Sequence, residues 1–365
     1  GLSEKMSAGR RTRRVLKEVS VKQEINKIPE KKEDVKVEFI KSQHNPLLSS
    51  ISEHRWESMQ TFNPAVIQIN GTVYLFYRAL GDNDFSRVGL AVSHDGETIS
   101  ERLPYPIYTY YPHEKRASHR ARKTSHAFAS GGGVHGGCED PRVTVIDDRI
   151  YMIFVAFNGW HDIRLAMTSI SIEDFLAKRF IWSPLQFLSD PKVIDKSGVV
   201  FPEKVGGKYV FLHRVFPNIL VDFEDSLDFS DGRVLQNKYA IHIREDIWDS
   251  RKIGAGAPPL KTDEGWLLVY YATDDRDASQ YKIGIMLLDL ENPLKVLYRT
   301  DAPAISPSEW YENVGHKAGI VYPCGAVIKD NKLFVYYGGA DTFVNVAYQD
   351  LDTILYQLKH QNVVE

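Results

Sequence analysis

The chain of 365 residues has only two cysteines, Cys138 and Cys324, and so lacks the cysteine density of a disulfide scaffold. We expect both to be buried free thiols. The chain also lacks any apolar run near the roughly 18 residues that a membrane helix requires. Its opening residues, GLSEKMSAGRRTRRVLKE, lack the apolar core of a secretory signal. These absences favour a cytoplasmic protein with no membrane partner.

The chain also has little net charge, because 45 Lys and Arg residues face 48 Asp and Glu residues, for a formal charge of −3. It therefore has no global field to attract nucleic acid. The basic run 113–126 is a local exception inside a long, glycine-ended loop, 113–137. Loops of this length in compact folds are usually functional, and we interpret this one as a lid. The histidines are not at ligand spacing, so we expect no metal and no other cofactor.

Five segments of the chain repeat one pattern of a proline, a short apolar strand, a polar turn and a second apolar-aromatic strand. They are FNPAVIQINGTVYLFYRA, EDPRVTVIDDRIYMIFVAF, VFPEKVGGKYVFLHR, APPLKTDEGWLLVYYAT and YPCGAVIKDNKLFVYYGGA. A third strand follows most of them, and the turns ING, IDD, VGG, TDEG and KDN suit tight hairpins. Multi-stranded repeats of this length are typical of propeller blades. We predict an all-β fold, a five-bladed β-propeller over residues 37–365.

Residues 1–36 differ from the repeats because they are highly charged and have few apolar positions. We predict a solvated N-terminal arm, partly helical or disordered. The alternative is an arm that packs on a neighbouring subunit, which leaves a homo-oligomer open. Within the repeats, SIEDFLAKR (171–179) is one short helix candidate.

The polar residues of the repeats are the candidate site, because a small propeller brings its first strands to one central channel. These residues are Asn63, Arg78, Arg87, Glu139, Asp140, Arg142, Lys196, Lys204, His213, Arg214, Tyr271, Tyr281 and Asp341. For any single one of them, a salt bridge between blades is the alternative. Cations outnumber carboxylates, and Arg and Lys hold phosphate well. Inverting hydrolysis needs two carboxylates, whereas phosphate attacks without a base. One acid with a phosphate site therefore indicates an inverting glycoside phosphorylase.

Ordered motifs from about residue 55 to the C-terminus carry a family resemblance. They are FNPA, YRA, SRVGLAVS, GCEDPR, FPEKVGGKYVFLHR, KIGAGAPP, GWLLVYY, YPCGAV and YYGGADT. With these motifs the chain resembles glycoside hydrolase family 130, five-bladed propellers that act on β-mannosides. The family contains both phosphorylases and β-1,2-mannosidases.

The resemblance implies a role for each candidate residue. Asp140, in GCEDPR, matches the general acid, which in related enzymes acts through the 3-hydroxyl of the bound mannose. Asn63, Arg78 and Asp341 match mannose-binding positions, and we assign Arg87, Glu139 and Arg142 to substrate binding as well. The implied phosphate-binding residues are Lys196, Arg214, Tyr271 and Tyr281, with Lys204 and His213 close by. Tyr271 stands where many of the phosphorylases have a histidine, and Lys196 where some members have an arginine.

We therefore expect cleavage of a β-linked manno-oligosaccharide by inorganic phosphate, the co-substrate, to give α-D-mannose 1-phosphate. An inverting β-1,2-mannosidase is the first alternative, and it would need a base from acids such as Glu224, Glu245, Asp246 or Asp249. A non-catalytic sugar-binding propeller is the second. Such a module would not need Asp140, and fold alone does not establish function.

Overall fold

A computed structural model describes residues 32–111, 136–158 and 163–365. The chain divides into a unit Gly1–Glu33 and a compact unit Asp34–Glu365. Residues 1–31 of the predicted arm lie outside the described residues. Residues 113–135 of the predicted lid lie outside them as well. None of the helices that the structure describes is long and apolar enough to span a membrane.

Along the described chain, the compact unit repeats one element, an antiparallel group of three strands, five times. The groups are β2 (Gln60–Ile69), β3 (Thr72–Leu80) and β4 (Phe85–Ser93); β7 (Gly136–Ile146), β8 (Arg149–Phe157) and β9 (Ile163–Ser171); β11 (Lys196–Val200), β12 (Tyr209–Val215) and β13 (Asn218–Glu224); β15 (Lys252–Ala255), β17 (Gly265–Asp274) and β18 (Asp277–Leu288); and β20 (Val321–Lys329), β21 (Lys332–Gly339) and β22 (Phe343–Asp350). The prediction of an all-β fold is confirmed.

Short strands extend each group on its outer side. They are β5 (Glu101–Arg102) and β6 (Tyr108–Thr109) on β4, β10 (Gln186–Phe187) on β9, β14 (Tyr239–Ile241) on β13, β19 (Val296–Arg299) on β18 and β1 (Ile40–Lys41) on β22, while β16 (Leu260–Thr262) pairs with β17. Because β1 comes from the start of the unit and β22 from its end, their pairing joins the two ends of the chain within the last sheet.

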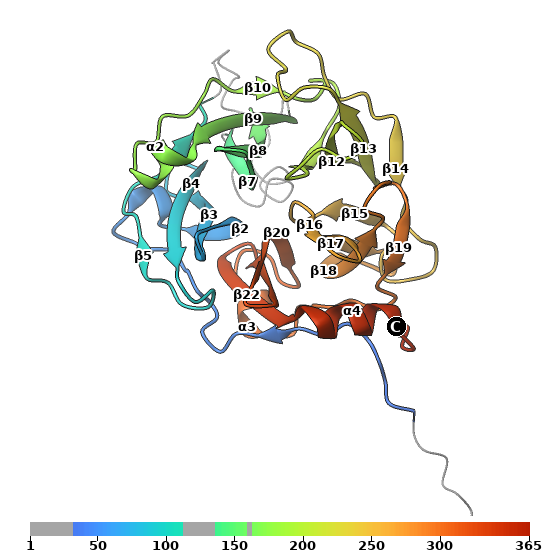
Figure 1. Ribbon diagram of the computed structural model, residues 1–365. Coiled ribbons are helices and arrows are strands. Elements are labelled where there is room, and N and C mark those ends of the chain that lie inside the picture. Colours follow the sequence, from blue (N-terminus) through green and yellow to red (C-terminus); the bar gives the residue numbers. More distant parts are fainter. Residues whose placement is uncertain (1–31, 112–135, 159–162) are drawn as a thin grey trace, which may run out of the picture. The chain divides into compact units, whose positions relative to one another are not determined.

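Helices are few and short in the described chain. They are η1 (Arg55–Glu57), α2 (Ile172–Leu176), α3 (Trp310–Asn313) and α4 (Leu351–Lys359). The predicted helix at 171–179 is confirmed as α2, which is shorter than expected and begins with the Ser171 hydroxyl accepting the Asp174 N–H. Helix α4 packs against β22 and β19 (Figure 1).

The sheets follow one another in chain order around a common centre, with β2, β7 and β20 near it (Figure 1). First strands contact first strands, β2 with β7, β7 with β11 and β11 with β15, and β20 contacts β2. The predicted hairpin turns are present. Asn70 and Gly71 have φ of 50° and 80°, and Asp330 and Asn331 have φ of 51° and 57°. Such pairs of positive φ values belong to the turns that match the twist of antiparallel strands.

Hydrophobic clusters lie between neighbouring groups, one at each junction. Phe76 of the first group packs with Phe154 of the second, for example. Leu75 of the first group packs with Phe334 of the fifth, so the last group is joined to the first. Burying a side chain of this size stabilises the fold by about 1.5–3 kcal/mol. Cys138 and Cys324 are buried and free, as predicted.

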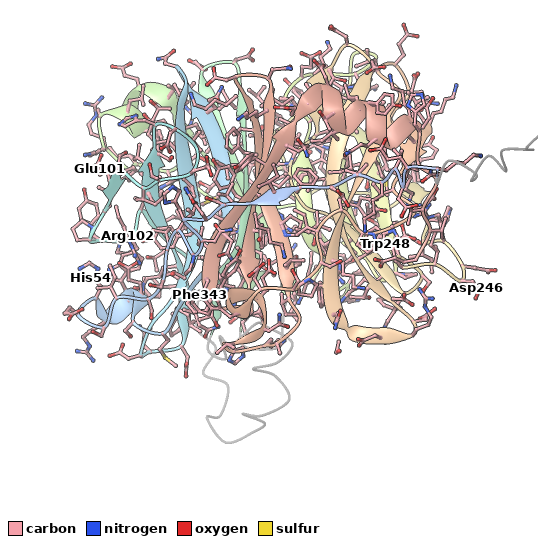
Figure 2. All side chains as sticks on the ribbon, turned by 90° about the horizontal axis from the view of Figure 1, so that it is seen from below. His54, Glu101, Arg102, Asp246, Trp248 and Phe343 are labelled. Atoms are coloured by element: carbon pink, nitrogen blue, oxygen red, sulfur yellow. The ribbon has the colours of Figure 1, made fainter. Side chains whose placement is uncertain are left out.

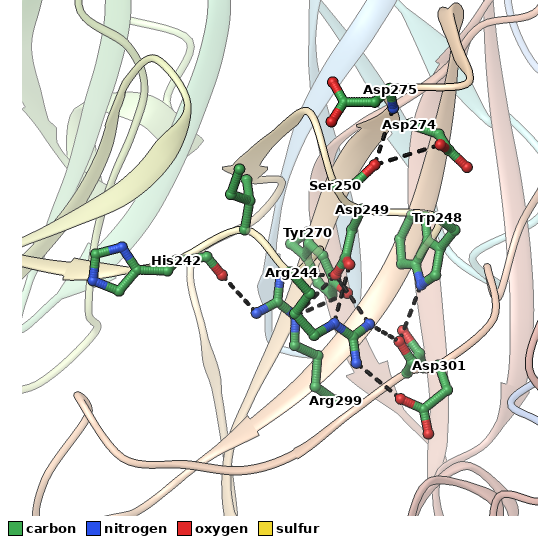
Figure 3. A network of polar contacts seen from close by, with 12 residues as sticks. His242, Arg244, Trp248, Asp249, Ser250, Tyr270, Asp274, Asp275, Arg299 and Asp301 are labelled. Carbon is green, nitrogen blue, oxygen red and sulfur yellow. Dashed lines mark hydrogen bonds and ion pairs between the residues drawn. The ribbon is translucent and has the colours of Figure 1, made fainter. Parts of the chain in front are cut away.

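Two buried carboxylates hold loops against these sheets. Asp249 accepts hydrogen bonds from Arg244 at 3.0 Å, from Arg299 at 2.9 Å and from Tyr270 at 2.9 Å, which fixes the segment leading into β15 (Figure 3). Glu57 lies 2.7 Å from Arg102 Nη2 and 2.7 Å from His54 Nδ1. Figure 2 shows these two partners on the same side of the unit.

A truncation at a junction between groups tests the core. Phe154 is 1% exposed and packs against Tyr108 with ring centroids 5.3 Å apart. Phe154→Ala should lower the free energy of unfolding by about 3–5 kcal/mol, because it leaves a cavity between two strand groups. Denaturant unfolding measures this change. Leu176→Ala, at a side chain 46% exposed, is the matched control. An equal loss in both variants would contradict the prediction.

Candidate active site

A shift in register, a β-bulge, interrupts the pairing of four of the first strands near the centre. The register shifts between Phe62 and Ala65 in β2, between Glu139 and Arg142 in β7, between Lys196 and Val199 in β11, and between Pro323 and Gly325 in β20. Such bulges bend a strand and redirect a side chain.

The residue at three of these steps has a positive φ, 49° at Asn63, 48° at Asp140 and 53° at Ser197. Asn and Asp tolerate this conformation better than most residues. Pro64 and Pro141 follow them, and proline suits a bulge because it has no N–H to give to the ladder. Local sequence therefore favours the turn that aims Asn63 and Asp140 away from the sheet.

The redirected side chains line a cavity of about 290 Å³ to which all five strand groups contribute. Its lining consists of Asn63, Arg78, Glu139, Asp140, Lys196, Arg214, Lys252, Tyr271, Tyr281, Lys317, Ile320, Tyr322 and Asp341. All but four of the residues proposed from the sequence are therefore brought together. The volume is near the lower end of that of small-molecule sites.

Asp140 is held by two neighbours across the cavity wall. Asn63 Nδ2 donates to Asp140 Oδ1 at 2.7 Å, and Arg78 Nη1 lies 3.1 Å from the same oxygen. Arg78 Nη2 also lies 3.2 Å from Glu139 Oε2. Burial would raise the pKa of Asp140, but the charges of Arg78 and Arg142 and the bond from Asn63 outweigh it and lower the pKa. Asp140 is therefore ionised at neutral pH.

The other two carboxyl groups titrate near neutrality. Burial raises the pKa of Glu139 to about 7, against the opposing charge of Arg78. Burial likewise raises the pKa of Asp341 to about 6, although Lys317 lies 3.9 Å away. The pKa values of the three carboxyl groups consequently differ, and shifted pKa values are common where acid–base chemistry occurs.

Cations outnumber these carboxyl groups in the lining, with Arg78, Lys196, Arg214, Lys252 and Lys317 present. Burial, then the charges of Arg214 and Lys196, lower the pKa of Lys252 to about 6. Arg214 Nε is buried and has no hydrogen-bond partner among the described residues. A buried cationic donor without a partner is costly, so the cavity is suited to an anion.

Three tyrosines form one wall of the cavity. The ring centroids of Tyr271 and Tyr322 are 4.6 Å apart, and those of Tyr271 and Tyr281 are 5.8 Å apart. The Tyr271 hydroxyl lies 2.5 Å from Ser197 Oγ, and Lys252 Nζ donates to the Tyr281 hydroxyl. The wall thus combines apolar ring faces with hydroxyl groups, a combination suited to sugars.

Four of the proposed residues do not line the cavity, which corrects their expected contact with ligands. Arg87 bonds to Asn83 Oδ1 at 3.1 Å. Lys204 is exposed with its Nζ 4.8 Å from the Tyr209 ring, and it lines a separate cavity.

His213 and Arg142 are the other two corrections. His213 is buried between two carboxylates, because consecutive strand residues face opposite sides and Arg214 takes the cavity side. Arg142 is 1% exposed and donates to the carbonyls of Asp140 and Gly256, each at 3.1 Å, so it supports the cavity from behind.

Sequence reasoning missed four lining residues, Lys252, Lys317, Ile320 and Tyr322. Lys252 begins the first strand of the fourth group, so alignment of the repeats could have found it. Tyr322 directly precedes the Pro-Cys of the fifth repeat, which is a similar signal. Lys317 lies between α3 and β20, where no repeat marks it.

Comparisons with known proteins identify the family of the chain. A family model described as beta-1,4-mannooligosaccharide phosphorylase, that of glycoside hydrolase family 130, matches residues 29–360. The chain is 35% identical over 319 residues to a 1,2-beta-oligomannan phosphorylase of a Thermoanaerobacter species, a match that covers 85% of this chain and 96% of that protein. It is 31% identical over 231 residues to a Beta-1,4-mannooligosaccharide phosphorylase of Ruminococcus albus, which covers 62% of this chain and 66% of that protein.

A solved structure has a similar fold. The Beta-1,2-mannobiose phosphorylase of Listeria innocua, in complex with beta-1,2-mannobiose, superposes with a TM-score of 0.68 at 24% identity and covers 88% of this chain and 99% of that chain. The family model, the relatives and the motifs of the repeats agree, and the chain is an enzyme that belongs to glycoside hydrolase family 130.

Proposed function

We propose that the unit is a five-bladed β-propeller and that its central cavity cleaves β-mannosides by phosphorolysis, with inversion, to release α-D-mannose 1-phosphate. One observation carries the proposal. A single bulge-presented aspartate, Asp140, shares a small cavity with five basic side chains, of which Arg214 has a buried donor without a hydrogen-bond partner in the described chain. The planar guanidinium group of arginine and the compact ammonium group of lysine both bind phosphate well.

Two halves of the cavity receive the two substrates. Asn63, Arg78, Glu139 and Asp341 surround Asp140 and hold the mannose. Lys196, Arg214 and Lys252, with Tyr271 and Tyr281, hold the phosphate. The cations offset the charge of the attacking oxygen where it approaches the anomeric carbon. The names of the relatives include both β-1,2- and β-1,4-linked substrates, and the more similar relative favours a β-1,2-linked oligomannan.

Asp140 supplies the proton to the leaving sugar, acting through the 3-hydroxyl of the mannose. The ionised state of Asp140 in the empty cavity results from the cations around it. Phosphate bound among those cations offsets their charge and raises the pKa of Asp140. The acid is then protonated only when the nucleophile is in place, so the order of binding protects the glycosidic bond from premature cleavage.

A mannosidase is the second candidate, and Glu139 is the observation in its favour, because a carboxyl group with a pKa of about 7 is suited to a general base. None of the four acids considered from the sequence, Glu224, Glu245, Asp246 and Asp249, lines the cavity. Asp249 is buried in its own ion pairs, and Glu224 is paired with Arg233. Sugar release from β-1,2- and β-1,4-mannobiose, with and without phosphate, decides between the two reactions. Mannose 1-phosphate formed only with phosphate supports the proposal.

Asp140→Asn should reduce kcat at least a thousandfold, because the amide has no proton to give at the reacting centre. Circular dichroism and thermal unfolding check that the fold is kept. Asp95→Asn, at a carboxylate bound within its own turn by Ser93 and Thr98, is the matched control. Substantial turnover by folded Asp140→Asn would refute the assignment of the acid.

Arg214→Ala should raise KM for phosphate at least tenfold and change KM for the mannoside much less, because Arg214 contacts only one of the two substrates. Steady-state kinetics with each substrate varied in turn measures both constants. Arg251→Ala, at a largely exposed arginine beside Asp275, is the control. A parallel rise in the two constants would count against a phosphate-specific role.

Phosphate binding should take up a proton at pH 7.5 through Lys252. Its pKa of about 6 leaves the amine neutral in the empty site, and a bound anion favours the charged form. Calorimetric titration with inorganic phosphate in two buffers of different ionisation enthalpy measures this uptake. It should fall in Lys252→Met and persist in Lys261→Met, whose amine pairs with Glu203 on the surface. Proton release, or an uptake unchanged in Lys252→Met, would exclude this linkage.

A further inference from the structure

His213 lies between two buried carboxylates directly behind the proposed phosphate site. Its Nδ1 is 2.7 Å from Asp195 Oδ2 and its Nε2 is 2.6 Å from Asp222 Oδ2. All three side chains are at most 3% exposed. Two flanking carboxylates require both ring nitrogens to donate, so the imidazole is cationic. Burial lowers the pKa of His213, but the bonds to the two carboxylates outweigh it and raise the pKa to about 9.

The chain places this group next to two cations of the cavity. Asp195 directly precedes Lys196, and His213 directly precedes Arg214. Lys196 and Arg214 are themselves opposite one another in the pairing of β11 with β12. Because strand residues alternate between faces, the imidazole and the two cations occupy opposite sides of the same strand pair.

The strand pair itself holds Lys196 poorly. The register shifts between Lys196 and Val199, and Ser197 between them has a φ of 53°, so the regular ladder stops where the two cations meet. Two like charges directly opposite one another are also destabilising. Burial lowers the pKa of Lys196, and the charge of Arg214 adds to this effect although the charge of Glu139 opposes it.

The buried group of Asp195, His213 and Asp222 compensates for the interrupted ladder and for the like charges of Lys196 and Arg214. The bond from His213 to Asp195 joins β12 to the residue before Lys196 where the ladder is interrupted. The carboxyl groups of Asp195 and Asp222 flank the imidazolium behind the cations, and burial raises the pKa of Asp195 against the bond and charge of His213. Asp222 anchors the group further, because its Oδ1 accepts the backbone N–H groups of Gln236 at 2.9 Å and Asn237 at 3.0 Å.

We propose that Asp195, His213 and Asp222 form a positioning bridge that holds Lys196 and Arg214 in the geometry that binds phosphate. His213 acts through these residues and touches neither substrate. The inference rests on the proposed function in one respect, that the anion bound by the two cations is phosphate.

His213→Gln tests the bridge, because one carboxamide reaches only one of the two carboxylates. The dissociation constant of inorganic phosphate, measured by calorimetry, and KM for phosphate should both rise at least tenfold. KM for the mannoside should change less than threefold.

Asp222→Asn is the conservative variant. Its amide can donate to a neutral His213 while its oxygen keeps the Gln236 and Asn237 bonds, so most of the phosphate affinity should return. His54→Gln, at a histidine beside Glu57 away from the cavity, should change nothing.

The outcomes separate the two hypotheses. Wild-type protein that releases sugar without phosphate refutes the proposed function. Phosphate-dependent wild-type protein with an unchanged phosphate constant in folded His213→Gln refutes the bridge, and so does an equal loss for both substrates. If His213→Gln does not fold, Asp195→Ala replaces it, because alanine removes the bond that joins His213 to the residue before Lys196. A larger loss of phosphate affinity than in Asp222→Asn supports the bridge, and equal affinities refute it.

Discussion

The cavity depends on one buried guanidinium, that of Arg142. Buried main-chain carbonyl groups must be satisfied, and several of those near the centre accept hydrogen bonds from this side chain. Arg142 donates to the carbonyls of Asp140, Ala255, Gly256 and Pro323, at 3.1–3.3 Å, and to the Tyr322 hydroxyl at 3.2 Å. It thereby ties together strands from three groups. The planar fork of five donors suits this task, and lysine would not replace it.

The cavity that Arg142 supports contains buried basic groups whose charged forms are unfavourable without a bound anion. Lys196, Lys252 and Lys317 all have lowered pKa values, because burial and the neighbouring cations disfavour their charged forms. The pKa of Asp140 is lowered, so this carboxyl group is ionised at neutral pH. On the proposed mechanism, bound phosphate would relieve both conditions at once, and its binding would be coupled to the protonation of Asp140. This arrangement explains why cations and carboxyl groups share so small a volume.

Much of the fold and of the candidate site could be predicted from the sequence, because strands, turns and bulges depend on residues close together in the chain. Each repeat contains its own strands and turns, and Asn-Pro and Asp-Pro mark the bulges at Asn63 and Asp140. The predicted site differs from the structure where two neighbouring residues of one strand could each have faced the cavity. His213 and Arg214 are neighbours in one apolar strand, and only the register of β12 decides that Arg214 faces the cavity and His213 the interior. Arg87 lies on β4 and Lys204 in the connection between β11 and β12, and neither position brings the side chain to the cavity.

By itself, the sequence determined the all-β repeats, the positions of the hairpins, the burial of both cysteines and the identity of the bulge residues, because hydrophobic period, turn chemistry and proline act within a few residues. The tertiary structure alone decided which cations share the cavity, that Lys317 joins them from a segment outside the repeats, and that Arg142 and His213 act from behind. Those outcomes depend on contacts between groups far apart in the chain, where burial and neighbouring charge, rather than local pattern, set the role of each side chain.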